Sequence, residues 1–454
     1  MLDFINKYIF GTAVPIILMG AGALYLILLK AFHLTRPKAI LKVLFKKSGD
    51  GGISPFRAVT LALAGTLGVG NIVGVSAAIS LGGFGSIFWM WITASLAMLL
   101  KYAEIVLAMK YRVYDNNGEP HGAAMYYIKA FFSRISLASL GGAIAAVFAV
   151  FCIINAVTMG SMIQANAISE SFEGVFDISP LLCGIALTLL CAAIIPRGTG
   201  AIAKFTEILV PVMSLGYVVI SLWVLIVKRD MLPSAIDSII SDAFSANSAA
   251  SGVIGFFLSR ALRFGTMRGL ISNEAGCGTA PTAHASSNSK CAVEQGFWGI
   301  FEVFADTILL CTMTALVVIV NFDELKFRGS WIMLTIDAYS NVLGNAASVF
   351  LAISVLCFGF ATIICWAHYG IESVRYFSHS GKARGIFIFI YCAAVFSGTM
   401  VTSEGIWSIA DLAIGVMTLI NVSVICLMSR EVRDETELYF GNYLKEYKKD
   451  KKAK

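Results

Sequence analysis

Residues 65–71 read Gly-Thr-Leu-Gly-Val-Gly-Asn and lie inside an apolar run that extends from Val59 to Leu81. A second apolar run, from Val253 to Ala285, contains Arg-Gly-Leu-Ile-Ser-Asn-Glu-Ala-Gly-Cys-Gly at residues 268–278. Glycine loosens a helix, and polar side chains at membrane depth are costly unless they have a function. Paired glycine-interrupted segments in the two halves of a membrane protein are typical of a transporter binding site. We therefore expect the chain to unwind midway across the bilayer at both places.

The composition of the chain is that of an integral membrane protein. Of its 454 residues, 58% are hydrophobic and 14% are charged, and the mean hydropathy is +0.80. Soluble domains carry roughly 25% charged residues. Long apolar runs indicate helices rather than the short alternating strands of a barrel. We predict an all-α polytopic protein that forms a single membrane transporter domain over residues 1–454, with the lipid bilayer as its environment.

Apolar runs long enough to cross a bilayer recur along the whole chain. We predict eleven spans, at 9–29, 57–81, 85–109, 142–168, 179–196, 204–227, 251–286, 296–320, 347–371, 386–402 and 406–428. Counted over alternate loops and ends, 25 Lys and Arg residues fall on one side and five on the other. Because basic residues stay on the cytoplasmic side, we expect the N-terminus outside and the C-terminus in the cytoplasm.

The ten spans after the first divide into two units of five that enter the membrane from opposite sides. We take residues 9–31 as an extra N-terminal helix, 55–227 as the first unit and 251–428 as the second. A basic cytoplasmic tail follows at 429–454, whose charge suits a membrane surface rather than nucleic acid. Each unit begins with a glycine-interrupted span. Opposite insertion of two such units predicts an inverted repeat, and topology alone supports it.

The first glycine cluster suits ligand binding. Gly65, Gly68 and Gly70 would let the helix open and free its backbone groups. Freed carbonyls suit a hard cation such as sodium, and freed amides suit a carboxylate. Asn71 adds a side-chain amide. The alternative is close helix packing, because Gly70 with Gly74, and Gly265 with Gly269, each form a GxxxG pattern. Two clusters at matching places favour the binding interpretation.

The second glycine cluster contains Asn273 and Glu274. A carboxylate inside a bilayer costs roughly 2.5 kcal/mol or more on insertion scales, so Glu274 must meet a partner, a proton, an ion or water. Arg263 and Arg268 are the candidate partners nearest in sequence. An ion pair that holds the broken helix in shape and direct ligation of a solute both remain open. We expect Asn273 to support the site rather than to contact the ligand.

Other polar residues lie inside predicted spans. Lys101 and Glu104 are three residues apart and can pair on one helix face, with a gating or structural role. Gln164 interrupts an apolar helix and should face the bundle interior. Thr362 and Trp366 share a helix face, where the hydroxyl would ligate sodium and the indole would wall a small pocket.

Three other classes of protein, an enzyme, an ATP-driven pump and a channel, find no support in the sequence. His284 and His368 lack a second ligand at metal spacing and are interpreted as core histidines. The sequence has no hydrolase or nucleotide-binding motif, which argues against an enzyme or an ATP-driven pump. A channel would need a continuous polar pore, whereas this sequence offers only local interruptions.

Several ordered motifs together resemble a known family. They are Gly-Val-Gly-Asn-Ile-Val-Gly-Val at 68–75, Phe-Trp-Met-Trp at 88–91, Gln-Ala-Asn at 164–166, the second glycine cluster running into Ala-Pro-Thr-Ala-His-Ala at 280–285, and Asp-Thr-Ile at 306–308. The set closely resembles the alanine or glycine:cation symporter family, the sodium:alanine symporters, from about residue 50 to 430. The resemblance implies a LeuT-like fold with ten core helices in a 5+5 inverted repeat, preceded by one extra helix.

The resemblance also implies cotransport of a small neutral amino acid with sodium, or less often with a proton, across a bacterial-type plasma membrane. We expect no cofactor apart from the coupling ion, and nothing in the sequence demands an obligate protein partner. Carried over to this chain, the substrate would be bound by Gly65, Thr66, Gly68, Gly70, Asn71, Gln164, Ile271, Ser272 and Trp366. Sodium would be bound by the carbonyls of Ala64 and Leu67 and by the hydroxyl of Thr362.

Two points stay open at the level of sequence. Small residues at the first cluster favour alanine, glycine or serine as substrate and leave the enantiomer open. The coupling ion is expected to be sodium, and a proton-coupled permease or exchanger that uses Glu274 is the alternative.

Overall fold

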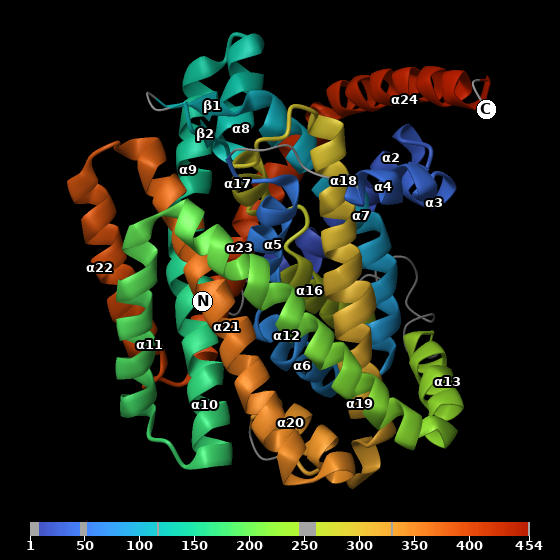
Figure 1. Ribbon diagram of the computed structural model, residues 1–454, viewed down its shortest axis with the longest axis vertical. Helices are drawn as coiled ribbons and strands as arrows, with labels where there is room; N and C mark the ends of the chain where they lie inside the picture. Colours follow the sequence, from blue (N-terminus) through green and yellow to red (C-terminus); the bar gives the residue numbers. More distant parts are fainter. Residues whose placement is uncertain (1–8, 46–51, 116–117, 245–259, 328–329, 453–454) are drawn as a thin grey trace.

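The computed structural model describes residues 9–45, 52–115, 118–244, 260–327 and 330–452. These residues form a bundle of helices, and their only strands are the short antiparallel pair β1 (Val113–Tyr114) and β2 (Pro120–His121). Among them, nine helices are long and apolar enough to cross a membrane, and one bent pair is a tenth candidate (Figure 1). The chain is therefore a helical, multi-pass membrane protein, as predicted.

Nine spans of the described residues are unbroken, although two of these nine contain a wide turn. They are α2 (Val14–Leu28), α7 (Gly85–Tyr111), α9 (Ala138–Val157) running through η3 (Thr158–Ile163) into α10 (Gln164–Phe176), α11 (Pro180–Ile194), α12 (Thr199–Val227), α18 (Ala292–Val303) running through η6 (Phe304–Cys311) into α19 (Thr312–Val320), α21 (Asn345–Phe377), α22 (Gly381–Gly398) and α23 (Ser403–Leu427). Both η3 and η6 are π-helical, a conformation that often marks functional sites.

Shorter helices lie between these spans and at the ends of the bundle. They are η1 (Ile9–Ala13), α3 (Phe32–Thr35), α4 (Pro37–Leu44), α8 (Ala124–Arg134), η4 (Ile195–Arg197), η5 (Arg229–Met231), α13 (Leu232–Ala243), η7 (Phe322–Glu324), α20 (Trp331–Leu343) and α24 (Ser429–Lys452).

Both glycine clusters interrupt a helix, as predicted. The first interrupted span consists of α5 (Pro55–Thr66), η2 (Val69–Asn71) and α6 (Val73–Gly82), and its two halves are bent by 58°. We call residues 67–72 the first break. The second interrupted span consists of α16 (Arg260–Asn273) and α17 (Ala280–Ala285), and we call residues 274–279 the second break.

The span predicted at 251–286 is described only from residue 260 onward, because residues 251–259 lie outside the described chain. The other ten predicted spans coincide with the ten membrane-span candidates. The total of eleven spans, the 5+5 inverted repeat and the extra N-terminal helix stay predictions. The predicted tail at 429–454 is helical as far as Lys452, in α24.

Helix α7 lies at the centre of the bundle, and α12 lies at its edge. α7 packs against both α16 and α18, and most of its apolar residues are buried. On α12, the side chains of Ile208, Val212 and Leu215 are each about two thirds exposed. Such an apolar face would be unusual in water, and lipid is its natural solvent. The edge helices α11 and α22 pack side by side away from the breaks (Figure 1).

Candidate functional site

At the first break, the chain departs from helical geometry at Gly68, a position where a side chain would not fit. A Cβ atom on Gly68 would lie 2.7 Å from Thr362 Oγ1 and 2.8 Å from Gln164 Oε1. Only glycine therefore lets α21 and α10 approach the unwound backbone so closely. Helix α5 ends at Thr66, and the buried residues Leu67 to Ile72 carry the chain across to α6. The predicted residues from Gly65 to Asn71 all lie at this point.

Two neutral side chains hold the first break. The Thr362 hydroxyl donates to the Ala64 carbonyl at 2.8 Å, and the Gln164 Oε1 atom accepts from the Val69 amide at 3.0 Å. The structure thus brings together Ala64 and Thr362, two of the three predicted sodium ligands, and Leu67 is three residues along the chain from Ala64. Oxygen atoms of this kind are the ligands that hard cations take.

The first break faces the end of α16. A Cβ atom on Gly70 would lie 3.6 Å from Ser272 Cα and 3.9 Å from Ile271 Cγ2. Both Ile271 and Ser272, predicted for the substrate site, belong to the last turn of α16. A Cβ atom on Gly74, by contrast, would meet no described residue within 4 Å, so close packing does not explain the Gly70–Gly74 pattern. Packing does explain Gly265, where a Cβ atom would overlap the Ser86 backbone of α7.

A residue absent from the predicted site joins the two interrupted spans. Asp306, in the π-helical turn η6, accepts from Asn71 Nδ2 at 2.7 Å and from Ser272 Oγ at 2.8 Å. It is fully buried. The signal in the sequence was available, since a carboxylate inside an apolar span is a functional-site hypothesis by default.

The second break turns on residues with positive φ. Glu274 has a φ of 53°, and Gly276 and Gly278 have φ values of 90° and 78°. The Glu274 carboxylate accepts from the Thr279 hydroxyl at 2.6 Å and from the Trp366 indole at 3.0 Å. Trp366 is completely buried and belongs to α21, so α21 touches both breaks.

The predicted arginine partners of Glu274 are wrong. The Arg268 guanidinium lies 4.8 Å from the centre of the Trp407 ring, and the Arg263 guanidinium lies 4.9 Å from the centre of the Phe264 ring. Neither makes an ion pair with Glu274 among the contacts of the described residues. The Glu–Arg pair that would have held the broken helix is therefore absent there.

The cation and the anion that hold the second break come from α7 instead. Lys101 Nζ donates to the Asn273 carbonyl at 2.6 Å, where α16 ends. Glu104 accepts from the amides of Gly276 and Gly278 at 3.1 Å and 2.9 Å. A positive charge thus meets the carbonyl end of a half-helix, and a negative charge meets free amides.

Lys101 and Glu104 do share a helix face, but they do not pair with each other as predicted. Lys101 Nζ lies 2.8 Å from Glu302 Oε1, and both side chains are completely buried. Glu302 also accepts from the Thr66 hydroxyl at 3.3 Å and contacts His284 Nε2 at 3.0 Å. His284 is thus a hydrogen-bonded core histidine, and Glu302 connects the end of α5 with the lysine of the second break.

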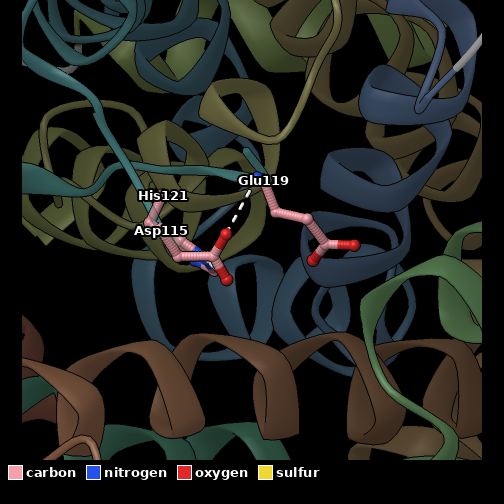
Figure 2. Close-up of side chains that lie close together, drawn as sticks. All are labelled: Asp115, Glu119 and His121. Carbon is pink, nitrogen blue, oxygen red and sulfur yellow. Dashed lines mark hydrogen bonds and ion pairs between the residues drawn. The ribbon is translucent and has the colours of Figure 1, made fainter. Parts of the chain in front are cut away.

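Asp115, Glu119 and His121 lie close together on the hairpin that carries β1 and β2 (Figure 2). The Glu119 amide donates to Asp115 Oδ1 at 2.9 Å, and His121 Nδ1 lies 3.1 Å from Glu372 Oε2. The Arg375 guanidinium lies against the same imidazole ring. Burial alone would lower the pKa of His121, but the Glu372 carboxylate outweighs it and raises that pKa. Because the positively charged Arg375 guanidinium already lies against this imidazole, the group is an ion-pair network rather than a metal site.

Comparisons with solved structures show the fold alone. A sodium-coupled sialic acid symporter matches with a TM-score of 0.50 and 13% identity, over 94% of this chain and 87% of that chain. A variant of the manganese transporter of Eremococcus coleocola matches with a TM-score of 0.51 and 14% identity, over 82% of this chain and 76% of that chain.

Comparisons of sequence identify the family. The sodium/alanine symporter AgcS of Methanococcus maripaludis is 32% identical over 97% of this chain and 96% of that protein. The amino-acid carrier protein AlsT of Bacillus subtilis is 30% identical over 94% of this chain and 88% of that protein. The model of the sodium:alanine symporter family matches residues 1–454. The chain, a multi-pass transport protein, therefore belongs to the sodium:alanine symporter family.

Proposed function

We propose that this protein is a secondary active symporter that imports a small neutral amino acid, alanine or glycine and also serine, together with sodium. The observation that carries the proposal is that two interrupted spans meet in the protein interior, at Gly70 and Ser272. Unwound backbone at membrane depth is tolerated only where it is buried in protein or lines a cavity. The name of the relative AgcS, a sodium/alanine symporter, supports the same substrate and ion.

Sodium would bind at the first break. The Thr362 hydroxyl and the Ala64 carbonyl already lie 2.8 Å apart, so an ion coordinated by both needs only a small separation of α21 from α5. The Leu67 carbonyl would be the third oxygen. Since these atoms come from two different helices, the ion would hold α21 against the first break.

The substrate would bind between the breaks. We assign its carboxylate to the backbone amides of the first break and its ammonium group to carbonyls near Ile271 and Ser272. Asn71, Gln164 and Trp366 would complete the site. The close approach of Gly70 to Ser272 leaves little room, which favours side chains no larger than that of serine. One relative is named a probable sodium/glutamine symporter, so size selection differs within the family.

The transport cycle would use the sodium gradient. Each sodium charge moved inward contributes about 2.3 kcal/mol per 100 mV of membrane potential. Rocking of one bundle of helices against the other would open the site to each side in turn. The excess of basic residues supports an orientation with the N-terminus outside and the C-terminus, with α24, in the cytoplasm.

The second candidate is proton coupling through Glu274. Its carboxylate is completely buried, and its two hydrogen-bond donors, Thr279 and Trp366, are both neutral. A carboxyl group that gains and loses a proton at the second break would change its bond to Trp366 and so act on α21.

Uptake of labelled alanine into proteoliposomes separates the two candidates. We expect uptake to fall at least tenfold when choline replaces sodium at fixed pH. Undiminished uptake without sodium would reject sodium coupling. The variant Glu274→Gln tests the proton candidate, and an unchanged pH profile of uptake in that variant would reject it.

A further inference from the structure

A cavity of about 380 Å³ lies between the end of the first span and the last helix of the chain. One wall is the turn that leads from α2 into α3, where Lys30 and Ala31 have φ values of 54° and 46°. The opposite wall is the part of α24 from Arg433 to Gly441. Helix α24 contacts α2 at one end of the bundle, so the cavity is formed by segments from opposite ends of the chain (Figure 1).

The lining of the cavity carries more positive than negative charge. It contains three basic side chains, Lys30, Arg36 and Arg433, and one carboxylate, Glu437. Lys30 Nζ lies 3.8 Å from Glu437 Oε1, and Arg433 Nη2 donates to Asp434 Oδ1 at 2.8 Å. Arg36 has no carboxylate partner among the residues that the structure describes. The excess positive charge suits an anionic ligand.

The guanidinium of Arg36 is positioned by an aromatic ring. It lies 4.6 Å from the centre of the Phe440 ring. Phe440 is buried, and its ring centre lies 5.5 Å from that of Phe32. Phe32 in turn packs against the rings of Tyr102 and Phe297 in the core. A guanidinium that stacks on a ring keeps the N–H groups in its plane free, and this planar fork matches the oxygens of a phosphate.

The cavity lies where the first span ends, which is the depth of lipid headgroups. Helix α2 ends at Leu28, and both Leu28 and Leu29 line the cavity. The apolar side chains of Leu34, Leu41 and Phe45, on the α3–α4 segment that follows, are exposed. Exposed apolar side chains next to basic ones are typical of a segment that lies in the membrane interface. Lipid can therefore reach the cavity from the side.

We propose that this cavity binds the headgroup of an anionic phospholipid, with its phosphate on the Arg36 guanidinium and its acyl chains along α2 and α4. Basic cavities between helices at the cytoplasmic side of a membrane protein are typical of such binding. In the orientation proposed above, this end of the bundle faces the cytoplasm. The lipid joins α24 to the end of the first span. The site is separate from both breaks, so the proposal does not depend on the symport proposed above.

Binding of radiolabelled phosphatidylglycerol to the purified full-length protein in a neutral detergent tests the proposal. The unmodified protein should bind it about tenfold more tightly than phosphatidylcholine, whose phosphate is neutralised by its own choline group. Arg36→Gln should weaken the binding of phosphatidylglycerol about tenfold. The matched control is Arg197→Gln, the same change on an exposed arginine of η4 that does not line the cavity, and it should bind like the unmodified protein.

A second variant covers the case in which Arg36→Gln does not fold. Lys30→Gln removes another basic side chain of the lining and should weaken the binding of phosphatidylglycerol about fivefold. The proposal is overturned if the two lipids bind equally tightly, or if the folded variant of the two binds phosphatidylglycerol normally. An equal loss in Arg197→Gln would also overturn it.

Inorganic phosphate in excess should not displace phosphatidylglycerol, because it lacks the acyl chains. Displacement would assign the cavity to a free anion and overturn the choice of a lipid. Alanine uptake is measured separately, so each of these results leaves the proposed symport unchanged.

Discussion

The two breaks are held open by opposite means. The backbone contacts that fix the first break come from neutral groups, the Thr362 hydroxyl and the Gln164 amide, whereas the Asp306 carboxylate bonds the side chain of Asn71. The contacts that fix the second break come from charges, with Lys101 on a carbonyl and Glu104 on two amides. The second break therefore has permanently charged side chains bonded to its backbone. Within the described part of the chain, the backbone dipoles of the first break have no such permanent charge against them, and we propose that an ion from solution supplies one.

This difference separates the structural role of the second break from the ligand-binding role that we propose for the first. A buried charge that is already paired is expensive to remove, so the second break should tolerate substitution poorly whatever the sodium concentration. The effect of substitutions at the first break should instead depend on the sodium concentration. The following experiments test that division, beginning with the largest expected effect.

Replacing Lys101 by Met should destabilise the protein by about 3–5 kcal/mol, because it leaves Glu302 as an uncompensated buried charge. The matched control is Lys110→Met on the same helix, whose lysine pairs with Glu431 and Glu435 at the surface. The control should cost less than about 1 kcal/mol. Thermal unfolding of the two variants in detergent measures the difference. Equal losses of stability would show that the buried charges of the second break contribute no more than an ion pair at the surface.

Replacing Gly68 by Ala should destabilise the protein by about 1–3 kcal/mol and reduce transport, because the new methyl group meets Thr362 and Gln164. Gly74→Ala is the control, since open space surrounds that position inside α6. There, alanine should be neutral or stabilising by up to about 1 kcal/mol. Thermal unfolding and alanine uptake should both show the larger loss for Gly68→Ala. A tolerated Gly68→Ala would show that α21 and α10 are not packed against the unwound backbone.

Replacing Thr362 by Val should raise the sodium concentration needed for half-maximal uptake about tenfold, which corresponds to about 1.4 kcal/mol. The alanine concentration needed at saturating sodium should change little. Thr362→Ser keeps the hydroxyl and should behave like the unmodified protein. If Val and Ser affect sodium dependence equally, the hydroxyl is not an ion ligand.

The smallest effect expected lies outside both breaks, at His121. Its raised pKa means that the protonated imidazole, paired with Glu372, stabilises the folded state. That contribution is complete below the pKa of about 6.5 that histidine has in an unfolded chain. It is lost as the pH rises through the higher value of the folded state. His121→Gln should remove this fall in melting temperature above pH 6.5, and a fall that persists would assign the pH dependence to another group.

The local features of the fold could be predicted from the sequence, and the long-range pairs could not. Glycine clusters and apolar runs act on their own segments, so both breaks and ten spans were located correctly. Lys101 pairs with Glu302, about two hundred residues away, and no periodicity links two such positions. Arg268 was assigned to Glu274 by nearness in sequence, yet its guanidinium packs on Trp407.

The candidate site was predicted in part for the same reason. Gln164 was found because it interrupts an apolar helix, and Thr362 because it shares a helix face with Trp366, and the structure places both against Gly68. Asp306 was quoted only as part of a motif. Its importance depends on Asn71 and Ser272 arriving from two different spans, which is a property of the tertiary structure.

The π-helical turns also matter for aligning relatives. Gln164 follows η3 directly, and Asp306 lies inside η6. A π-helical turn closes with one more residue than an α-helical turn. A homologue with a single-residue gap at 158–163 or 304–311 would tighten the turn toward regular α-helix and change the direction of the side chains in the turn itself, Asp306 among them. Gap position in these two windows is thus a sequence criterion for separating homologues that retain this chemistry from those that have lost it.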